Sequence, residues 1–169
     1  GATNDLATGG TAAGFPLLAP LWDDLSMNNA GFRTVTTGTA PNRMFTAEWR
    51  NARWDVNAAG PVVSFEVKLY ENTNVVQFAY RPEFGAVVNT SGGASVGLVG
   101  AAGDYLSLSD LGGFPVLSSS IATNDIGSPP NFGRLYSFTP ARVLYDFAVK
   151  TAPYLPLATP AATPSGGNA

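Results

Sequence analysis

Apolar and polar side chains alternate most regularly between residues 62 and 81. On the first arm of this stretch, the apolar positions are Val63, Phe65, Val67 and Leu69. A period of two residues is typical of a β-strand with one buried face. A turn-forming run follows at 72–74, and the return arm has apolar residues at Val76, Phe78 and Tyr80. The pattern predicts a β-hairpin, which needs further strands against its apolar face to be stable in water.

The same alternation predicts strands on both sides of the hairpin. Strands are expected before it over residues 32–37 and 43–53, and after it over residues 95–99, 105–109, 134–139 and 143–150. Gly97 lies inside one of them, which indicates a bulge or a close approach of another backbone. With about eight strands and little or no helix, the expected fold is all-β. It is a two-sheet antiparallel β-sandwich of the jelly-roll or immunoglobulin-like kind.

The predicted core consists of large apolar side chains on the hairpin and on the strand before it. They are Trp49, Phe65, Leu69 and Phe78. Residues 15–25 are also apolar, but Pro16 and Pro20 exclude a regular helix through them. We expect this segment to be irregular and to close one end of the core with Leu18, Leu21 and Trp22.

Composition divides the chain into three parts. Residues 1–14 are small and polar and are expected to form a flexible arm or loop. Residues 15–150 form the sandwich domain, and residues 151–169 are a tail rich in Pro, Ala and Thr. Within the domain, residues 110–133 are predicted to be irregular. They form either a functional surface or a packed connection.

Charge and residue usage narrow the classes of function. Charged residues make up 12% of the chain, about half the usual share. The net charge is −3, and the basic residues are scattered along the chain. The sequence therefore contains no cluster of positive charge that would bind nucleic acid or an anionic membrane. Because the chain has neither Cys nor His, it cannot build Ser-His-Asp or Cys-His catalysis or an ordinary zinc or copper site. The side chains that remain for catalysis are carboxylates, hydroxyls and guanidinium groups, and we expect no cofactor apart from calcium, if any binds.

Asp23 and Asp24 are adjacent acids directly after a buried aromatic position. They allow three interpretations. One carboxylate caps a turn through backbone N–H groups while the other faces water. Alternatively the pair contributes calcium ligands, or it takes part in acid–base catalysis. If the chain binds a metal, we expect calcium at these two residues, because only oxygen ligands are available.

Two other groups of side chains are candidate sites, an acidic pair for acid–base catalysis and three aromatic residues for sugar binding. Glu48 and Glu66 fall on the polar faces of neighbouring predicted strands, where Arg50 and Lys68 can pair with them in a solvated charge ladder. Three aromatic residues predicted to be exposed could stack on sugars or cover a sheet edge, namely Trp54, Tyr70 and Phe132.

Four stretches of the chain resemble a known module. They are PLLAPLWDDL (16–25), RMFTAEW (43–49), FEVKLYENTNVVQFAY (65–80) and ASVGL (94–98). Together they are similar to a β-sandwich module of large secreted Bacteroidota proteins, which often carry a type IX secretion signal, and more distantly to nidogen-like domains. The resemblance implies an extracellular or cell-surface location and an adhesive or structural role, with no catalytic residues to carry over. Such modules usually have several strands before the WDDL segment, so the N-terminal strands are expected to be missing here.

These observations lead to a functional prediction. The chain is expected to be a non-enzymatic extracellular structural or adhesive protein, with a carbohydrate-binding module as the alternative and a glycan-processing fragment as a third possibility. A sandwich that lacks strands leaves an edge that recruits another strand. The candidate strand carries Val143, Tyr145, Phe147 and Val149. We therefore expect a homo-oligomer or filament built by strand exchange, or an upstream segment that supplies the strands, with glycans as further partners and no membrane insertion.

Overall fold

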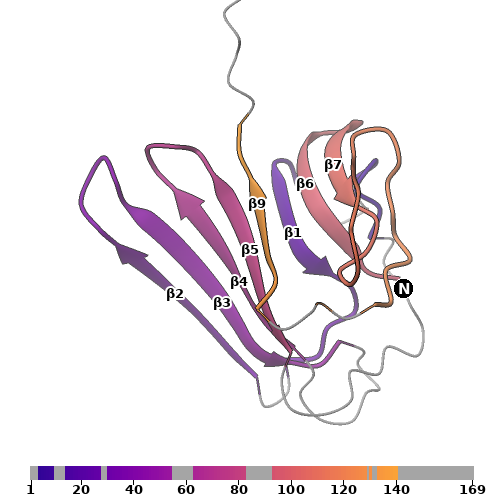
Figure 1. Ribbon diagram of the computed structural model, residues 1–169, viewed down its shortest axis with the longest axis horizontal. Helices are drawn as coiled ribbons and strands as arrows, with labels where there is room; N and C mark the ends of the chain where they lie inside the picture. Colours follow the sequence, from indigo (N-terminus) through magenta and orange to yellow (C-terminus); the bar gives the residue numbers. More distant parts are fainter. Residues whose placement is uncertain are drawn as a thin grey trace, which may run out of the picture.

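The computed structural model describes residues 4–9, 14–27, 30–54, 63–82, 93–128, 130 and 133–140. Nine strands form two antiparallel sheets (Figure 1). They are β1 (Leu17–Trp22), β2 (Gly31–Thr37), β3 (Met44–Ala52), β4 (Val63–Tyr70), β5 (Val76–Pro82), β6 (Ser95–Ala101), β7 (Asp104–Leu108), β8 (Leu117–Ser118) and β9 (Leu135–Phe138). The described segments contain no helix long and apolar enough to cross a membrane. The predicted all-β two-sheet architecture is confirmed.

The larger sheet has five strands in the order β2-β3-β4-β5-β9. The predicted hairpin is β4 and β5, in which Phe65 pairs with Tyr80 and Val67 with Phe78. Its turn contains Asn74 with a φ of 54°, a backbone conformation that asparagine tolerates better than most residues. The strands predicted over 32–37, 43–53 and 134–139 are β2, β3 and β9.

The smaller sheet has four strands in the order β1-β6-β7-β8. Its centre requires a glycine, because a Cβ added at Gly97 would lie 1.9 Å from the carbonyl oxygen of Leu106 on β7. The close backbone approach predicted for Gly97 is therefore confirmed. Most of the stretch predicted to be irregular, 110–133, has no regular structure where it is described. It contributes the two-residue β8 and an isolated bridge from Ala94 to Ile126.

The prediction that residues 15–25 are irregular is wrong for β1. Pro20 is compatible with this strand for two reasons: β1 lies at the edge of its sheet, and its pairing with β6 is interrupted by a bulge between Ala19 and Trp22. Leu21 is buried as predicted, at 3% exposure, but Leu18 is 36% exposed. Leu18 therefore does not close the core.

Two of the four predicted core side chains are fully buried between the sheets. Phe65 and Phe78 are 2% and 0% exposed. Trp49 and Leu69 also point toward the core, but they are only partly buried against it. Their shallower burial follows from their position on the side of the large sheet that the small sheet does not fully cover.

Trp54 is fully buried, which corrects the prediction that it is an exposed aromatic. The pairing of β3 with β4 shifts between Trp49 and Ala52, and Asn51 in that interval has a φ of 59°. Such a bulge inserts one extra residue and reverses which positions face inward. Ala52 and Trp54, both 0% exposed, consequently point into the core.

The described part of the predicted N-terminal arm lies against the small sheet. Leu6 is 0% exposed and packs with Ala19 and Val99. The Asn4 side-chain amide donates to the carbonyl of Trp22 at 2.7 Å. This loop therefore contributes the buried side chain of Leu6, which the small and polar composition of residues 1–14 did not predict. The predicted strand over 143–150 and the tail over 151–169 lie outside the described residues.

Candidate functional site

A row of four aromatic rings crosses the inner face of the five-stranded sheet. The rings belong to Phe32, Trp49, Phe65 and Tyr80, which are directly paired on β2 to β5. Their centroids are 4.9, 5.2 and 6.4 Å apart in that order. Directly paired residues point to the same side of a sheet. Exposure changes along the row, from 58% for Phe32 to 3% for Tyr80, so one continuous aromatic surface is buried at one end and open at the other.

The open end exists because the small sheet stops at β1. Among the described strands, β1 has only β6 as a neighbour, and it lies against β4 of the large sheet. The Tyr80 hydroxyl donates to the carbonyl of Pro20 on β1. Burial raises the pKa of Tyr80 well above its usual value, so the phenol stays protonated and keeps this bond. No described strand lies beyond β1 to cover β3 and β2.

We call the uncovered inner surface of these two strands the open face. It comprises Phe32, Thr34, Thr36, Phe45 and Trp49. Every residue of β2 is exposed, and Phe45 is 38% exposed. Figure 1 shows β2 on the side of the molecule farthest from β6 and β7. The open face is therefore a partly apolar sheet surface with solvent where a sandwich would place a second layer.

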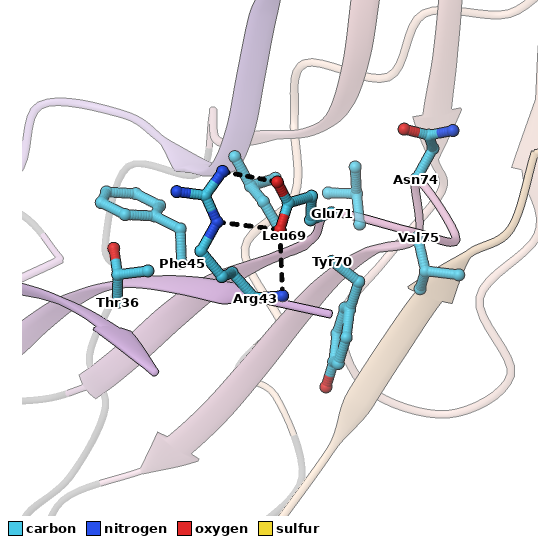
Figure 2. A pocket seen from close by; sticks show the side chains of 9 residues that line it. Thr36, Arg43, Phe45, Leu69, Tyr70, Glu71, Asn74 and Val75 are labelled. Carbon is cyan, nitrogen blue, oxygen red and sulfur yellow. Dashed lines mark hydrogen bonds and ion pairs between the residues drawn. The ribbon is translucent and has the colours of Figure 1, made fainter. Parts of the chain in front are cut away.

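Two hollows adjoin the open face. The first, the β1 groove, measures about 300 Å³ and is lined only by apolar residues, namely Leu17, Leu18, Ala19, Pro20, Leu21, Trp22, Leu25, Trp49 and Phe65. The second, the tip pocket, measures about 450 Å³ and lies where the β2–β3 and β4–β5 hairpins turn (Figure 2). Its floor is formed by one row of paired residues, Thr36, Phe45, Leu69 and Val76.

An ion pair borders the tip pocket. Arg43 Nε donates to Glu71 Oε2 at 2.8 Å, and the Arg43 backbone N–H donates to the same oxygen at 3.1 Å. Figure 2 shows both guanidinium contacts and the backbone contact as dashed lines. These bonds from Arg43 lower the pKa of Glu71 to about 2. The pair ties the start of β3 to the end of β4 and gives the apolar pocket a charged rim.

The opposite, outer face carries the predicted charge ladder. Glu48 and Glu66 are directly paired across β3 and β4. Lys68 forms an ion pair with Glu66 as predicted, but Glu48 pairs with Arg33 rather than Arg50. Arg33 takes this role because it lies opposite Glu48 on β2. Each carboxylate therefore has a cationic partner at the surface, and the arrangement is a solvated ladder.

Asp23 has a structural role in the fold. Its Oδ2 accepts a hydrogen bond from the Trp54 indole N–H at 2.8 Å, and its Oδ1 accepts one from the Asp24 backbone N–H at 2.8 Å. The Asp24 side chain is exposed. The described residues include no group of three or more Asp, Glu, His or Cys side chains placed to hold a metal. The turn-capping interpretation describes Asp23 well, and calcium at Asp23 and Asp24 stays a prediction.

The three aromatic side chains considered for sugar stacking do not come together. Trp54 is buried, and Phe132 lies outside the described residues. Tyr70 is half-buried on the outer side of the hairpin and donates to Gln77 Oε1 at 2.9 Å. The exposed aromatic residues near the open face are instead Phe32 and Phe45. One sequence signal could have found Phe32: the inward positions of β2 are Phe32, Thr34 and Thr36, a half-polar pattern typical of a partly solvated face.

Comparison with known proteins places the chain in a domain family. The family model described as NIDO related matches residues 1–140, which is most of the chain and includes every described strand. No curated protein and no solved structure matches the sequence.

Proposed function

The chain belongs to the NIDO-related family, whose domains are typically extracellular, and from this premise we propose that it is a non-enzymatic structural or adhesive module. The observation that carries the proposal is the open face. An aromatic sheet surface beside an edge strand is a template for another strand. A strand added to the free edge of β1 would extend the small sheet over Trp49 and Phe45 and complete the sandwich.

The strand is supplied by the segment with Val143, Tyr145, Phe147 and Val149, taken from a second copy of the chain. Every second residue there is large and apolar, which suits a strand with one face against an aromatic surface. The starting point of the segment also fits. Phe138 on β9 pairs with Val76, which lines the tip pocket, and the described chain ends at Pro140. The described chain therefore ends beside the tip pocket, at the edge of the large sheet opposite to β2.

The distance to be covered is close to the limit of the chain. β3 lies three strand spacings of about 4.8 Å from β9, and the second layer of a sandwich lies about 10 Å above the sheet. From Phe138 to Val143 the fully extended chain spans up to about 17 Å, so the segment reaches the open face of its own subunit only when extended, and a neighbouring copy can supply it without this constraint. Exchange between copies is a head-to-tail contact, and a contact of that kind propagates into a filament when it does not close.

Substitutions on the two sides of the segment test strand exchange. Phe147→Asp places a charge on the side that would face the aromatic rings, whereas Ala148→Asp places the same charge on the opposite side. Sedimentation velocity over a range of concentrations should show wild type and Ala148→Asp as assemblies and Phe147→Asp as monomer. A monomeric wild type whose melting temperature falls with Phe147→Asp would show docking within one subunit. A folded monomer insensitive to both changes would favour an upstream segment that supplies the strands.

A carbohydrate-binding module is the second candidate, and the tip pocket favours it. The pocket combines an accessible ring, Phe45, with the polar groups of Arg43, Glu71 and Asn74. Sugar sites commonly join aromatic stacking with a few oriented polar groups. A glycan array would show saturable binding that Phe45→Ala abolishes. Array binding unchanged in Phe45→Ala, or absent in wild type, would remove this candidate.

The narrower assignment to secreted Bacteroidota proteins rests on the four resembling stretches and is part of the same proposal. It predicts that the parent protein is exported and displayed at the cell surface. Fractionation of the source cells, with detection of this domain in the medium or on the surface, measures that directly. Confinement of the domain to the cytoplasm would contradict it.

A further inference from the structure

The outer face of the five-stranded sheet has a hollow beside the charge ladder. It measures about 330 Å³. Its floor lies at two small side chains, Ser64 and Ala79, which alternate with long charged ones in the register of β4 and β5. The small sheet lies on the other side of the large one, so no described strand covers this face (Figure 1). The long side chains around the floor are Arg33, Glu48, Arg50, Glu66 and Arg81.

The bulge in β3 places Arg50 at this hollow. The pairing of β3 with β4 shifts between Trp49 and Ala52, and Arg50 lies in that interval. The next residue, Asn51, donates its backbone N–H to Ser64 Oγ at 2.9 Å, which ties the backbone beside Arg50 to the floor. The Arg50 side chain is exposed, and no described side chain forms an ion pair with it. Its guanidinium is therefore available to a ligand.

Positive charge is in excess on this face. The outward-facing positions of β2 to β5 carry four basic and two acidic side chains, whereas the whole chain has nine basic and twelve acidic residues. The two ion pairs of the ladder neutralise both carboxylates. The excess charges are then those of Arg50 and Arg81, and a surface with net positive charge attracts anions. The basic residues are scattered in the sequence, and the register of the sheet brings them together.

We propose that this hollow, the arginine hollow, binds the carboxylate or sulfate group of an anionic polysaccharide. Guanidinium groups present planar pairs of N–H donors that match the oxygens of such anions. The ladder carboxylates fit the same ligand, because they accept hydrogen bonds from sugar hydroxyls. The inference goes beyond the proposed function, since it concerns the face of the sheet opposite to the open face.

The lining favours a polysaccharide over an acidic protein segment. Protein interfaces bury an apolar core, and the exposed apolar group that the hollow offers is the methyl group of Ala79. Phe65 and Tyr80 also border the hollow, but their side chains are buried on the inner face. A polysaccharide needs no such core, because its hydroxyls and anionic groups bind to polar walls. NIDO-related domains are typically extracellular, where such polymers occur.

A second hollow continues the same surface toward β2. It measures about 270 Å³ and shares Arg33, Glu48 and Glu66 with the arginine hollow. A single small anion would fill one of the two hollows, whereas a linear polymer can follow both. The pair of hollows therefore fits a polysaccharide chain better than a free ion.

Binding of defined polymers tests the arginine hollow. The probes are polygalacturonate, which carries carboxylates, dextran sulfate, which carries sulfates, and neutral dextran as the control. Isothermal titration calorimetry with the full chain should show saturable binding to at least one anionic polymer and none to dextran. The polymer that binds more tightly identifies the anion as carboxylate or sulfate. A higher salt concentration should weaken the binding, because the charges on both partners are exposed.

Three substitutions locate the site. Arg50→Gln should weaken binding about fivefold, the size of one exposed charge contact. Ala79→Gln should also weaken it although no charge changes, because the longer side chain fills the floor. The matched control is Arg134→Gln, which removes the same charge from a side chain that donates to the Gly113 carbonyl at 3.2 Å, and it should bind as wild type does. Unchanged melting temperatures of Arg50→Gln and Ala79→Gln confirm that they are folded.

The outcomes separate this inference from the proposed function. Equal weakening in Arg50→Gln and Arg134→Gln indicates attraction by net charge alone and overturns the inference. Polyglutamate that binds as tightly as the polysaccharides would assign an acidic protein segment and overturns it too. Binding that is lost in Phe45→Ala but kept in Arg50→Gln belongs to the tip pocket and has the same consequence. An assembling wild type that binds neither anionic polymer overturns the arginine hollow and leaves strand exchange standing, whereas binding by a monomeric wild type supports the hollow and overturns strand exchange.

Discussion

Gly97→Ala tests the close approach at the centre of the small sheet. The added Cβ would lie 1.9 Å from the Leu106 carbonyl oxygen and 2.9 Å from Leu6 Cδ1. Side-chain contacts of this kind are normally longer than 3.0 Å, so the β7 backbone must retreat by about an ångström. Because Leu106 lies on the strand that pairs with β6, the retreat strains the β6–β7 ladder itself. Leu6, which is fully buried, has little room to move.

Overpacking of this kind costs about 1–3 kcal/mol, and we expect the upper half of that range because the obstacle is backbone. For a chain of this size, about 2–3 kcal/mol lowers the melting temperature by roughly 4–12 °C. The matched control is Gly31→Ala at the start of β2, where an added Cβ meets nothing within 4 Å. It should change stability by less than about 0.5 kcal/mol. Thermal melts followed by circular dichroism measure both. Equal melting temperatures for Gly97→Ala and wild type would refute the pairing of β6 with β7.

Three further predictions concern the core, the ion pair and calcium. Phe65→Ala should lower the free energy of unfolding, measured by chemical denaturation, by about 3–5 kcal/mol. Trp49→Ala should lower it clearly less, because only the Phe65 ring is fully buried. The reverse order would show the inward assignments to be wrong. The pKa of Glu71 is lowered to about 2, so the stability from this group is complete above its unfolded pKa near 4.5 and is lost as the pH falls toward 2. A carboxyl titration by NMR should show this value in wild type and a near-normal one in Arg43→Gln, and equal values would count against the ion pair. Millimolar calcium should leave the melting temperature unchanged in wild type and in Asp23→Asn, although Asp23→Asn itself should melt lower because its bond to the indole is weakened; a calcium shift that requires Asp23 would establish a metal site.

Regular alternation made the central strands predictable, and its interruptions explain the errors. The β4–β5 hairpin was predicted correctly because Phe65 and Phe78 each fall in an unbroken period of two. The sequence did not predict β1 because proline is rare inside strands. Pro20 is tolerated because β1 is an edge strand and because Pro20 lies in a bulge of its pairing with β6. The bulge around Asn51 reverses the phase of β3, and no local signal places it. That bulge is why Trp54 is buried although the pattern placed it outside.

The candidate site depends on the relation between the two sheets, which alternation along one strand does not encode. Alternation along residues 43–53 puts Phe45 on the same face as the predicted core residue Trp49, and that face is the inner one. Whether an inner face is covered depends on how far the opposite sheet extends, and the small sheet ends at β1. The exposure of Phe32 and Phe45 follows from that end point. For residues 110–133 the sequence predicts either a functional surface or a packed connection and names no site residue, because an irregular stretch has no periodic signature.

The measurement that tests the central claim most directly compares two substitutions on opposite faces of β2. Phe32 points to the open face and Val35 to the outer face, and their exposures are similar at 58% and 54%. Neither Phe32→Asp nor Val35→Asp should unfold the chain, since both side chains are already largely in water. Sedimentation equilibrium should give wild-type assembly for Val35→Asp and monomer for Phe32→Asp. Wild-type assembly in both variants, or monomer in wild type, would contradict association through the open face.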